Sequence, residues 1–184
     1  MEVLVRPAEE LRHGDVTLRR WRAADADLAY GLVTASLEHL RPWMSWAAEY
    51  SPEAAAEYLR GCEQEWASGA AFSYLISERG VPCGSAGLMA RIGPGGLEIG
   101  YWVARDRVGR GIATAAAAAL TEAAFGLPGI ERTEIVHDLN NVASGHIPRK
   151  LGYARVGTAV GRFPKAPGEC GTSAIWRLVR PAAG

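Results

Sequence analysis

The sequence contains few of the residues that build disulfide frameworks or metal centres. Its 184 residues include three cysteines, widely spaced at Cys62, Cys83 and Cys170, and four histidines. An odd number of scattered cysteines without a CxxC pair favours reduced thiols, as is usual in cytoplasmic proteins. The histidines do not have the spacing typical of a metal site. We therefore expect a cytoplasmic protein that uses no metal.

An excess of one charge and a long apolar run are lacking as well. Twenty basic and twenty acidic residues give a formal net charge of zero, which argues against a direct nucleic-acid partner. The most apolar stretch, residues 112–127, is interrupted by Thr121 and Glu122 and is too short to cross a bilayer. Residues 1–15 mix charges throughout, without the apolar centre of a signal peptide. We expect neither a membrane partner nor an export signal.

The order of apolar and polar residues predicts one mixed α/β (α+β) domain. Helix-like periodicity and capping signals predict four helices: one capped at Asp25 or Asp27 and running through Leu37, one over residues 51–69, one from Ile112 through Ala124, and one over residues 141–152. Alternating or apolar runs predict seven strands, over residues 16–21, 71–80, 82–92, 97–103, 132–138, 153–160 and 172–179. Hairpins and crossovers both occur, so we expect a mixed sheet with helices on its faces. We assign residues 1–184 to a single domain with a core at about 16–179.

The stretch "VGRGIAT", residues 108–114, joins a glycine-containing loop to an alanine-rich helix. The first N–H groups of a helix lack partners within the helix, and its dipole adds positive charge there, so this geometry binds phosphate groups. A P-loop is excluded because its GK[ST] ending is missing, and a dinucleotide-binding GxGxxG is disfavoured because Thr114 stands at its sixth position. A diphosphate-binding loop and a plain turn that starts a helix both stay open on these residues alone.

Three motifs in fixed order carry a resemblance to a known family. The strand "LEIGYWV", the loop "VGRGIAT" and the segment "NNVASGHIPRKLGY" together resemble the GCN5-related N-acetyltransferase (GNAT) superfamily. "HLRPWMSW" and the order of elements resemble its RimJ/RimL-like subgroup of ribosomal-protein N-acetyltransferases. The resemblance covers about residues 16–179. It implies a GNAT fold, in which about seven mostly antiparallel strands form a twisted sheet flanked by about four helices.

The resemblance also implies acetyl-CoA as the acyl-donor cosubstrate. The family's phosphate loop reads Q/R-x-x-G-x-G/A, and this chain departs from it at Val108. The preceding strand is expected to splay from its neighbour at a bulge near residues 101–103, where free backbone groups would pair with the pantetheine arm. The residues expected to bind the coenzyme are Tyr101, Trp102, Val103, Val108, Gly109, Arg110, Gly111, Ile112, Ala113, Thr114, Asn141 and Ser144.

Two residues are candidates for the chemistry of acetyl transfer. Glu98 lies where several members of the superfamily place a catalytic glutamate, and it acts either as a base or as the ion-pair partner of an arginine on the neighbouring strand. Many relatives carry a catalytic tyrosine where this chain has Pro148. Ser144, which RimL-like enzymes are thought to place near the thiolate, either fills that role or only belongs to the cap at Asn141. Proline has no N–H, so Pro148 frees the carbonyl of Ser144 for another partner.

The acceptor pocket is expected at Trp43, Met44 and Trp46, where an aromatic wall would suit an N-terminal peptide or a hydrophobic amine. Packing between two helices is the alternative for these three residues. The favoured function is an acetyl-CoA-dependent N-acetyltransferase that acts by direct attack on a protein or peptide N-terminal α-amine, ribosomal or other. A small-molecule or antibiotic acceptor, a donor such as succinyl-CoA, a non-catalytic acyl-CoA-binding protein and a homodimer stay open.

Overall fold

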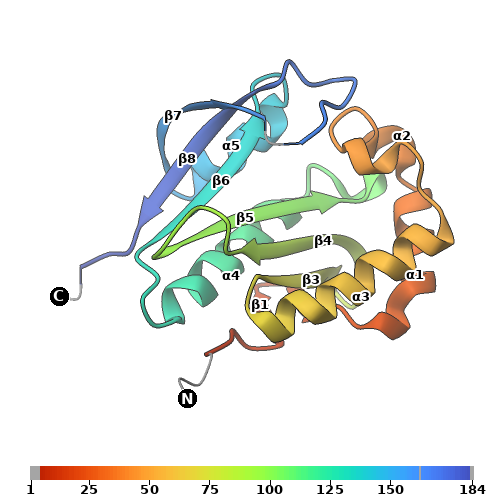
Figure 1. Ribbon diagram of the computed structural model, residues 1–184, viewed down its shortest axis with the longest axis horizontal. Helices are drawn as coiled ribbons and strands as arrows, with labels where there is room; N and C mark the ends of the chain where they lie inside the picture. The colour runs from red at the N-terminus through yellow and green to blue at the C-terminus, as the bar shows by residue number, and fades with distance from the viewer. Residues whose placement is uncertain (1–4, 162, 183–184) are drawn as a thin grey trace.

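One mixed sheet of eight strands organises the computed structural model, which describes residues 5–161 and 163–182 (Figure 1). The order is β1-β2-β3-β4-β5-β6-β8-β7, and β5 with β6 is the one parallel pair among the described strands. Residues 1–4, 162, 183 and 184 of the expected domain lie outside the described residues. The strands are β1 Glu10–His13, β2 Val16–Arg20, β3 Ala71–Glu78, β4 Val81–Met89, β5 Gly96–Val103, β6 Arg132–Asp138, β7 Ala154–Val160 and β8 Thr172–Val179.

Within the described residues, five α-helices connect these strands: α1 Ala26–Thr34, α2 Leu37–Leu40, α3 Pro52–Ser68, α4 Ile112–Gly126 and α5 Val142–Lys150. Helix α3 begins where its sequence predicts, because the Ser51 hydroxyl accepts a hydrogen bond from the Ala54 N–H at 3.2 Å and Pro52 is its first residue. It ends at Gly69, whose φ of 79° is left-handed. None of the helices in the described part of the chain has the length and apolar character that crossing a bilayer requires.

The predicted α/β class and mixed sheet are confirmed, with two differences in detail. The eighth strand, β1, is a short, largely exposed edge strand that pairs with β2, and its polar sequence "ELRH" carries no strand pattern. The helix expected over residues 25–37 is divided into α1 and α2. The chain turns at Ser36, whose buried hydroxyl accepts a hydrogen bond from the Arg105 N–H at 3.2 Å. This tertiary contact ends the first helix earlier than its apolar pattern does.

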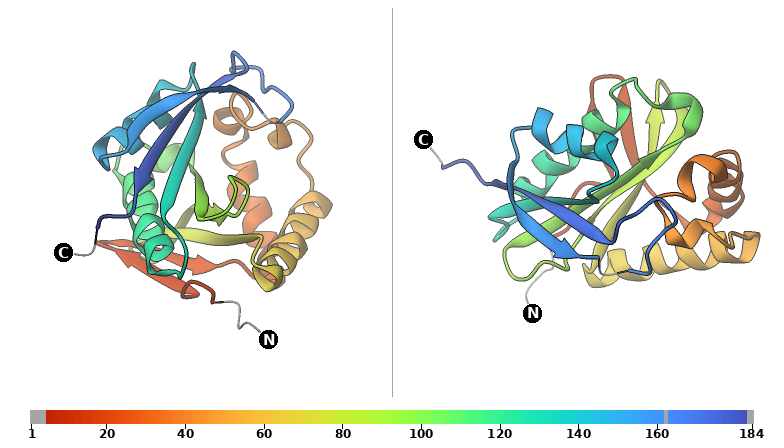
Figure 2. Two further views of the ribbon diagram at one scale, coloured as in Figure 1. Left: turned by 60° about the vertical axis from the view of Figure 1, so that its left-hand side comes forward. Right: turned by 90° about the horizontal axis from the view of Figure 1, so that it is seen from above.

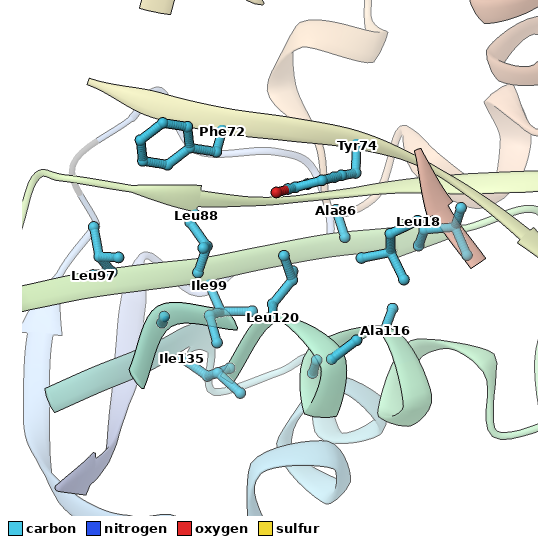
Figure 3. Packing of buried hydrophobic residues seen from close by; sticks show 14 of the residues in the cluster. Leu18, Phe72, Tyr74, Ala86, Leu88, Leu97, Ile99, Ala116, Leu120 and Ile135 are labelled. Carbon is cyan, nitrogen blue, oxygen red and sulfur yellow. The ribbon is translucent and has the colours of Figure 1, made fainter. Parts of the chain in front are cut away.

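Helices cover the two faces of the sheet differently. Helix α4 packs against β5, β4, β2 and β1, while α3 packs on β3 from the opposite side together with α1 (Figure 2). The predicted apolar face of α4 is confirmed, since Ile112, Ala116, Leu120 and Ala124 are all buried. Ala116 and Leu120 point from α4 towards Ile99 and its neighbours on the sheet (Figure 3). Small alanine side chains therefore let the helix lie close to the sheet.

Strands β5 and β6 separate part of the way along their length. They pair from Gly96 with Arg132 to Ile99 with Ile135, after which β5 continues along β4 and β6 continues along β8. The expected splay is present, but the expected bulge near residues 101–103 is wrong, because β5 pairs with β4 in continuous register from Glu98 to Val103. The separation instead arises because each strand follows its other neighbour. The backbone edge of β5 from residue 100 to residue 103 thus faces away from β4 without pairing to β6.

Candidate active site

The glycine loop leads into α4, whose first residue is Ile112 and whose N-terminus has no side-chain cap. Gly109 and Gly111 have φ angles of 76° and 78°, which glycine adopts without strain. The Ala115 N–H bonds the Gly111 carbonyl at 2.9 Å, so the three N–H groups before it have no acceptor within the helix. A Cβ added at either glycine would meet nothing within 4 Å. Exposed donors, positive helix dipole and open space fit the diphosphate of a coenzyme.

A buried carboxylate anchors this loop to β3. Glu78 is 9% exposed and pairs with Arg107 at 3.1 Å and with Arg110 at 2.9 Å. The guanidinium of Arg110 is therefore held by the protein, and Val108, 49% exposed, offers no donor in its side chain. The remaining hydrogen-bond donors at the start of α4 include its first backbone N–H groups and the Thr114 hydroxyl. Glu78 is not among the residues predicted for the site, and its available signal in the sequence is an acidic residue that ends an otherwise largely apolar strand.

The start of α5 meets β5 across the point where β5 and β6 separate. The Asn141 side chain accepts a hydrogen bond from the Ser144 N–H at 3.2 Å, as a helix cap does. The Tyr101 hydroxyl lies 3.3 Å from the Ser144 carbonyl oxygen and 3.4 Å from the Ser144 hydroxyl oxygen. The carbonyl that Pro148 leaves free therefore has a donor. Burial raises the pKa of Tyr101 to about 12, which keeps this donor protonated.

Glu98 lies in a row of charged residues on the sheet face opposite α4. It is 6% exposed and forms an ion pair with Arg91 in the β4–β5 connection. Its neighbour across the parallel pair is Glu134, which accepts a hydrogen bond from the Arg177 Nε at 2.8 Å. If Glu98 has a structural role, it is expected to pair with an arginine of the neighbouring strand. Arg91 is such a partner, but it lies in a loop and not in a strand. The strand expected over residues 82–92 includes Arg91, but β4 ends at Met89, so Arg91 reaches Glu98 from the loop that follows the strand.

Aromatic residues gather beside the same strand face. Trp102 lies on the same face of β5 as Glu98, and its ring centroid lies 6.4 Å from that of Trp46, which is 45% exposed. Trp46 also lies 5.8 Å from the Tyr50 ring. Met44 and Trp102 pack together with Tyr50 against the small cluster of Val33, Leu40 and Ala47, and Trp43 is partly buried on the same link. This aromatic wall combines helix packing with an exposed aromatic surface.

The β7–β8 loop closes over this region. The Gly168 N–H bonds the Pro42 carbonyl at 2.8 Å, and the Arg91 guanidinium lies 5.1 Å from the centre of the Phe163 ring. Asp138, at the end of β6, anchors the loop by accepting backbone N–H bonds from Gly171 at 2.8 Å and Cys170 at 3.0 Å. Burial on its own raises the pKa of Asp138, but these backbone hydrogen bonds outweigh it and hold the pKa below its usual value.

The family described as "Acetyltransferase (GNAT) domain" matches residues 15–154. The protein of Bacillus subtilis with the name "Putative ribosomal N-acetyltransferase YdaF" is 27% identical over 152 residues, which cover 78% of this chain and 80% of that protein.

Solved structures share the fold over most of their length. RimL, a ribosomal L7/L12 α-N-protein acetyltransferase in complex with coenzyme A, superposes with a TM-score of 0.81 at 21% identity, covering 90% of this chain and 94% of RimL. RimJ of Mycobacterium smegmatis in complex with a CoA disulfide gives a TM-score of 0.80 at 25% identity, covering 92% of this chain and 85% of RimJ. The microcin C7 self-immunity acetyltransferase MccE, in complex with acetyl-CoA and AMP, gives a TM-score of 0.81 at 18% identity, covering 90% of this chain and 93% of MccE.

Proposed function

The chain belongs to the GNAT family of acetyltransferases, and we propose that this acetyl-CoA-dependent N-acetyltransferase acts on the α-amine of a protein N-terminus, such as that of a ribosomal protein. Two relatives support the acceptor class, since the names of YdaF and RimL both refer to ribosomal N-acetyltransferases. We further propose that residues 1–184 form one domain with a core at about residues 16–179, in line with a core cluster that extends from β2 to β8. We also propose that it works in the cytoplasm.

The observation that carries the acceptor class is the ion pair between Glu98 and Arg91. An α-amine has a pKa of about 7.7–8.0, so roughly one molecule in ten is neutral at pH 7. A lysine amine, with a pKa of about 10.4, is neutral in roughly four molecules in ten thousand. An acceptor that arrives largely ready to attack depends less on a strong base. A site whose buried glutamate is engaged by an arginine therefore suits an α-amine better than a lysine side chain.

The coenzyme fits the separated strands and the glycine loop. We assign its diphosphate to the backbone N–H groups of residues 109–114, and its pantetheine arm to the unpaired edge of β5 at residues 101–103 and to Asn141 and Ser144 at the start of α5. The bound thioester supplies the acetyl group, which the amine attacks directly. On the face of β5 that carries Glu98, away from α4, Met44, Trp46 and Trp102 shield the first side chain of the acceptor from water. Trp43 lies at the margin of this aromatic wall.

We assign Ser144 as the donor towards the departing thiolate, and Glu98 either acts as a base through water or serves only to hold Arg91. Glu98→Gln separates these two roles, and Glu134→Gln is its matched control, because both glutamates are buried, paired with an arginine and adjacent on neighbouring strands. A base role predicts that Glu98→Gln alone lowers kcat by about 100-fold or more and removes the acidic limb of the pH profile. A structural role predicts that both variants lose stability and keep kcat within a few-fold of the wild type.

Release of CoA thiol from acetyl-CoA measures the proposed function directly. The panel contains peptides with free and blocked N-termini, a peptide whose one amine is a lysine side chain, and small amines, and each acceptor is repeated with succinyl-CoA. We expect turnover with free N-termini and its loss on blocking. Preference for a small amine would favour the small-molecule alternative, for which MccE gives a precedent in fold. Binding of CoA without release from any pair would contradict the enzyme reaction.

A further inference from the structure

We propose that Tyr101 is a positioning residue for acetyl transfer, whose hydroxyl holds the Ser144 side chain and the first turn of α5 at the reacting end of the coenzyme site. The inference rests on the proposed role of Ser144 as the donor to the thiolate. It concerns the hydroxyl of Tyr101, whereas coenzyme binding at this position involves the backbone.

The contact depends on one residue within α5, Pro148. In an α-helix the N–H of residue 148 bonds the carbonyl of residue 144, and Pro148 has no N–H to give. The Tyr101 hydroxyl, from β5, lies 3.3 Å from that carbonyl oxygen. Ser144 is partly buried, and a carbonyl withdrawn from water without a donor is costly, so the tyrosine satisfies a group that the helix leaves open. The side chain thereby links β5 to α5 at the place where β5 and β6 separate.

The same hydroxyl also reaches the side chain of Ser144. The two hydroxyl oxygens are 3.4 Å apart, and each carries one proton and two lone pairs. When Tyr101 donates to the Ser144 carbonyl, its oxygen can accept from the Ser144 hydroxyl. The serine is held in this arrangement until a stronger acceptor, the negatively charged sulfur, forms beside it.

In the proposed reaction, Ser144 passes the proton between the amine nitrogen and the sulfur. As the amine nitrogen bonds the acetyl carbon and the C–S bond breaks, the sulfur takes the proton of the Ser144 hydroxyl, and the serine oxygen recovers a proton from the attacking nitrogen. The serine gives one proton and regains one in the same exchange, so the net transfer runs from the attacking nitrogen to the sulfur and no serine alkoxide is formed. Burial raises the pKa of Tyr101 to about 12, which keeps its hydroxyl protonated. Tyr101 stays protonated and acts through Ser144.

Tyr101→Phe removes the hydroxyl and keeps the ring. Loss of one neutral hydrogen bond that orients the donor predicts a fall in kcat of about 3- to 10-fold, with the KM values for acetyl-CoA and peptide within twofold of wild type. Tyr153→Phe is the matched control, because its hydroxyl bonds Thr121 and Thr133 at 2.7 Å in the core between α4 and β6. That variant is expected to unfold at lower urea and to keep its kcat. An unchanged kcat in Tyr101→Phe would overturn the inference.

Pro148→Ala provides a second test from the helix side. The restored N–H of residue 148 bonds the Ser144 carbonyl and competes with Tyr101, so kcat is expected to fall by a similar factor while the helix gains a hydrogen bond. In the variant that combines both substitutions, the loss should be no greater than in Tyr101→Phe alone. Losses that multiply would show that the two groups act independently and would overturn the inference.

Ser144→Ala separates this inference from the proposed function. If Ser144→Ala keeps the wild-type kcat, the role of Ser144 fails, and the positioning role of Tyr101 fails with it. If Ser144→Ala lowers kcat while Tyr101→Phe does not, only the positioning role fails. A lower kcat in both variants, with no further loss when they are combined, is the expected result.

Discussion

Replacement of Gly109 by alanine should damage coenzyme binding much more than it damages folding. Gly109 has a φ of 76°, and an added Cβ would meet nothing within 4 Å. The cost to the folded protein is therefore the left-handed backbone alone, about 1–2 kcal/mol for a residue with a Cβ. Alanine also restricts the unfolded chain and returns about 0.4–1 kcal/mol. We expect a loss of about 1 kcal/mol in the free energy of unfolding.

Binding of the coenzyme loses more, because the open space beside Gly109 is where a phosphate oxygen approaches the backbone. A hydrogen bond to a charged group contributes about 1.5–3 kcal/mol. The loss of one such bond corresponds to a Kd for CoA that is about 10- to 100-fold higher. The expected effect on binding is thus larger than the backbone strain can explain.

Gly129→Ala is the matched control for this prediction. Gly129 lies between α4 and β6, has a φ of 74°, and likewise has no atom within 4 Å of an added Cβ. Calorimetric titration with CoA and urea unfolding should show equal losses of stability in the two variants and weaker CoA binding only in Gly109→Ala. Wild-type affinity in Gly109→Ala, or equal weakening in both variants, would refute the assignment of the diphosphate to this loop.

Variants of Trp46, Gly84 and Asp138 test three further contacts. Trp46→Ala should raise the KM for a peptide with an apolar N-terminal residue about tenfold, because roughly 1.5 kcal/mol of apolar contact is lost, and leave the KM for acetyl-CoA unchanged in steady-state assays. Gly84→Ala should cost about 2–3 kcal/mol in urea unfolding, since its Cβ would lie 2.3 Å from the Trp102 carbonyl oxygen; wild-type stability would contradict this close approach. Because the pKa of Asp138 is lowered in the folded protein, its contribution to the free energy of unfolding is complete above the ordinary carboxyl pKa of about 4 and is lost as the pH falls through the lower folded value. In Asp138→Asn, the free energy of unfolding should therefore fall less between pH 5 and pH 2 than it does in the wild type.

Much of the fold could be predicted because its signals are local. The cap at Ser51, the proline at Pro52 and the left-handed Gly69 define α3 within its own residues. The four-residue spacing of Ile112, Ala116, Leu120 and Ala124 likewise sets the buried face of α4. The misplaced details depend on distant partners. The additional strand, β1, forms because β2 lies beside it, and α1 ends early because the Arg105 N–H bonds the Ser36 hydroxyl.

The candidate site divides in the same way. The glycine loop, Asn141 with Ser144, and the aromatic link at Met44 and Trp46 were found in the sequence, and the structure places them around the separation of β5 and β6. Their functional roles stay predictions. The bulge near residues 101–103 was wrong because strand register depends on both neighbours, which no single strand encodes.

The sequence by itself determined which segments wind into helices, which face of each helix or strand is apolar, and where a loop of glycines exposes backbone donors. These properties depend on residues within one or two turns of each other. Only the tertiary structure decided that Glu98 is bound by Arg91, that Glu78 holds Arg107 and Arg110, and that Tyr101 meets Ser144. Apart from the first of these, the partners lie tens of residues apart, and even Arg91 reaches Glu98 from a loop. The strands and helices must pack before such side chains meet.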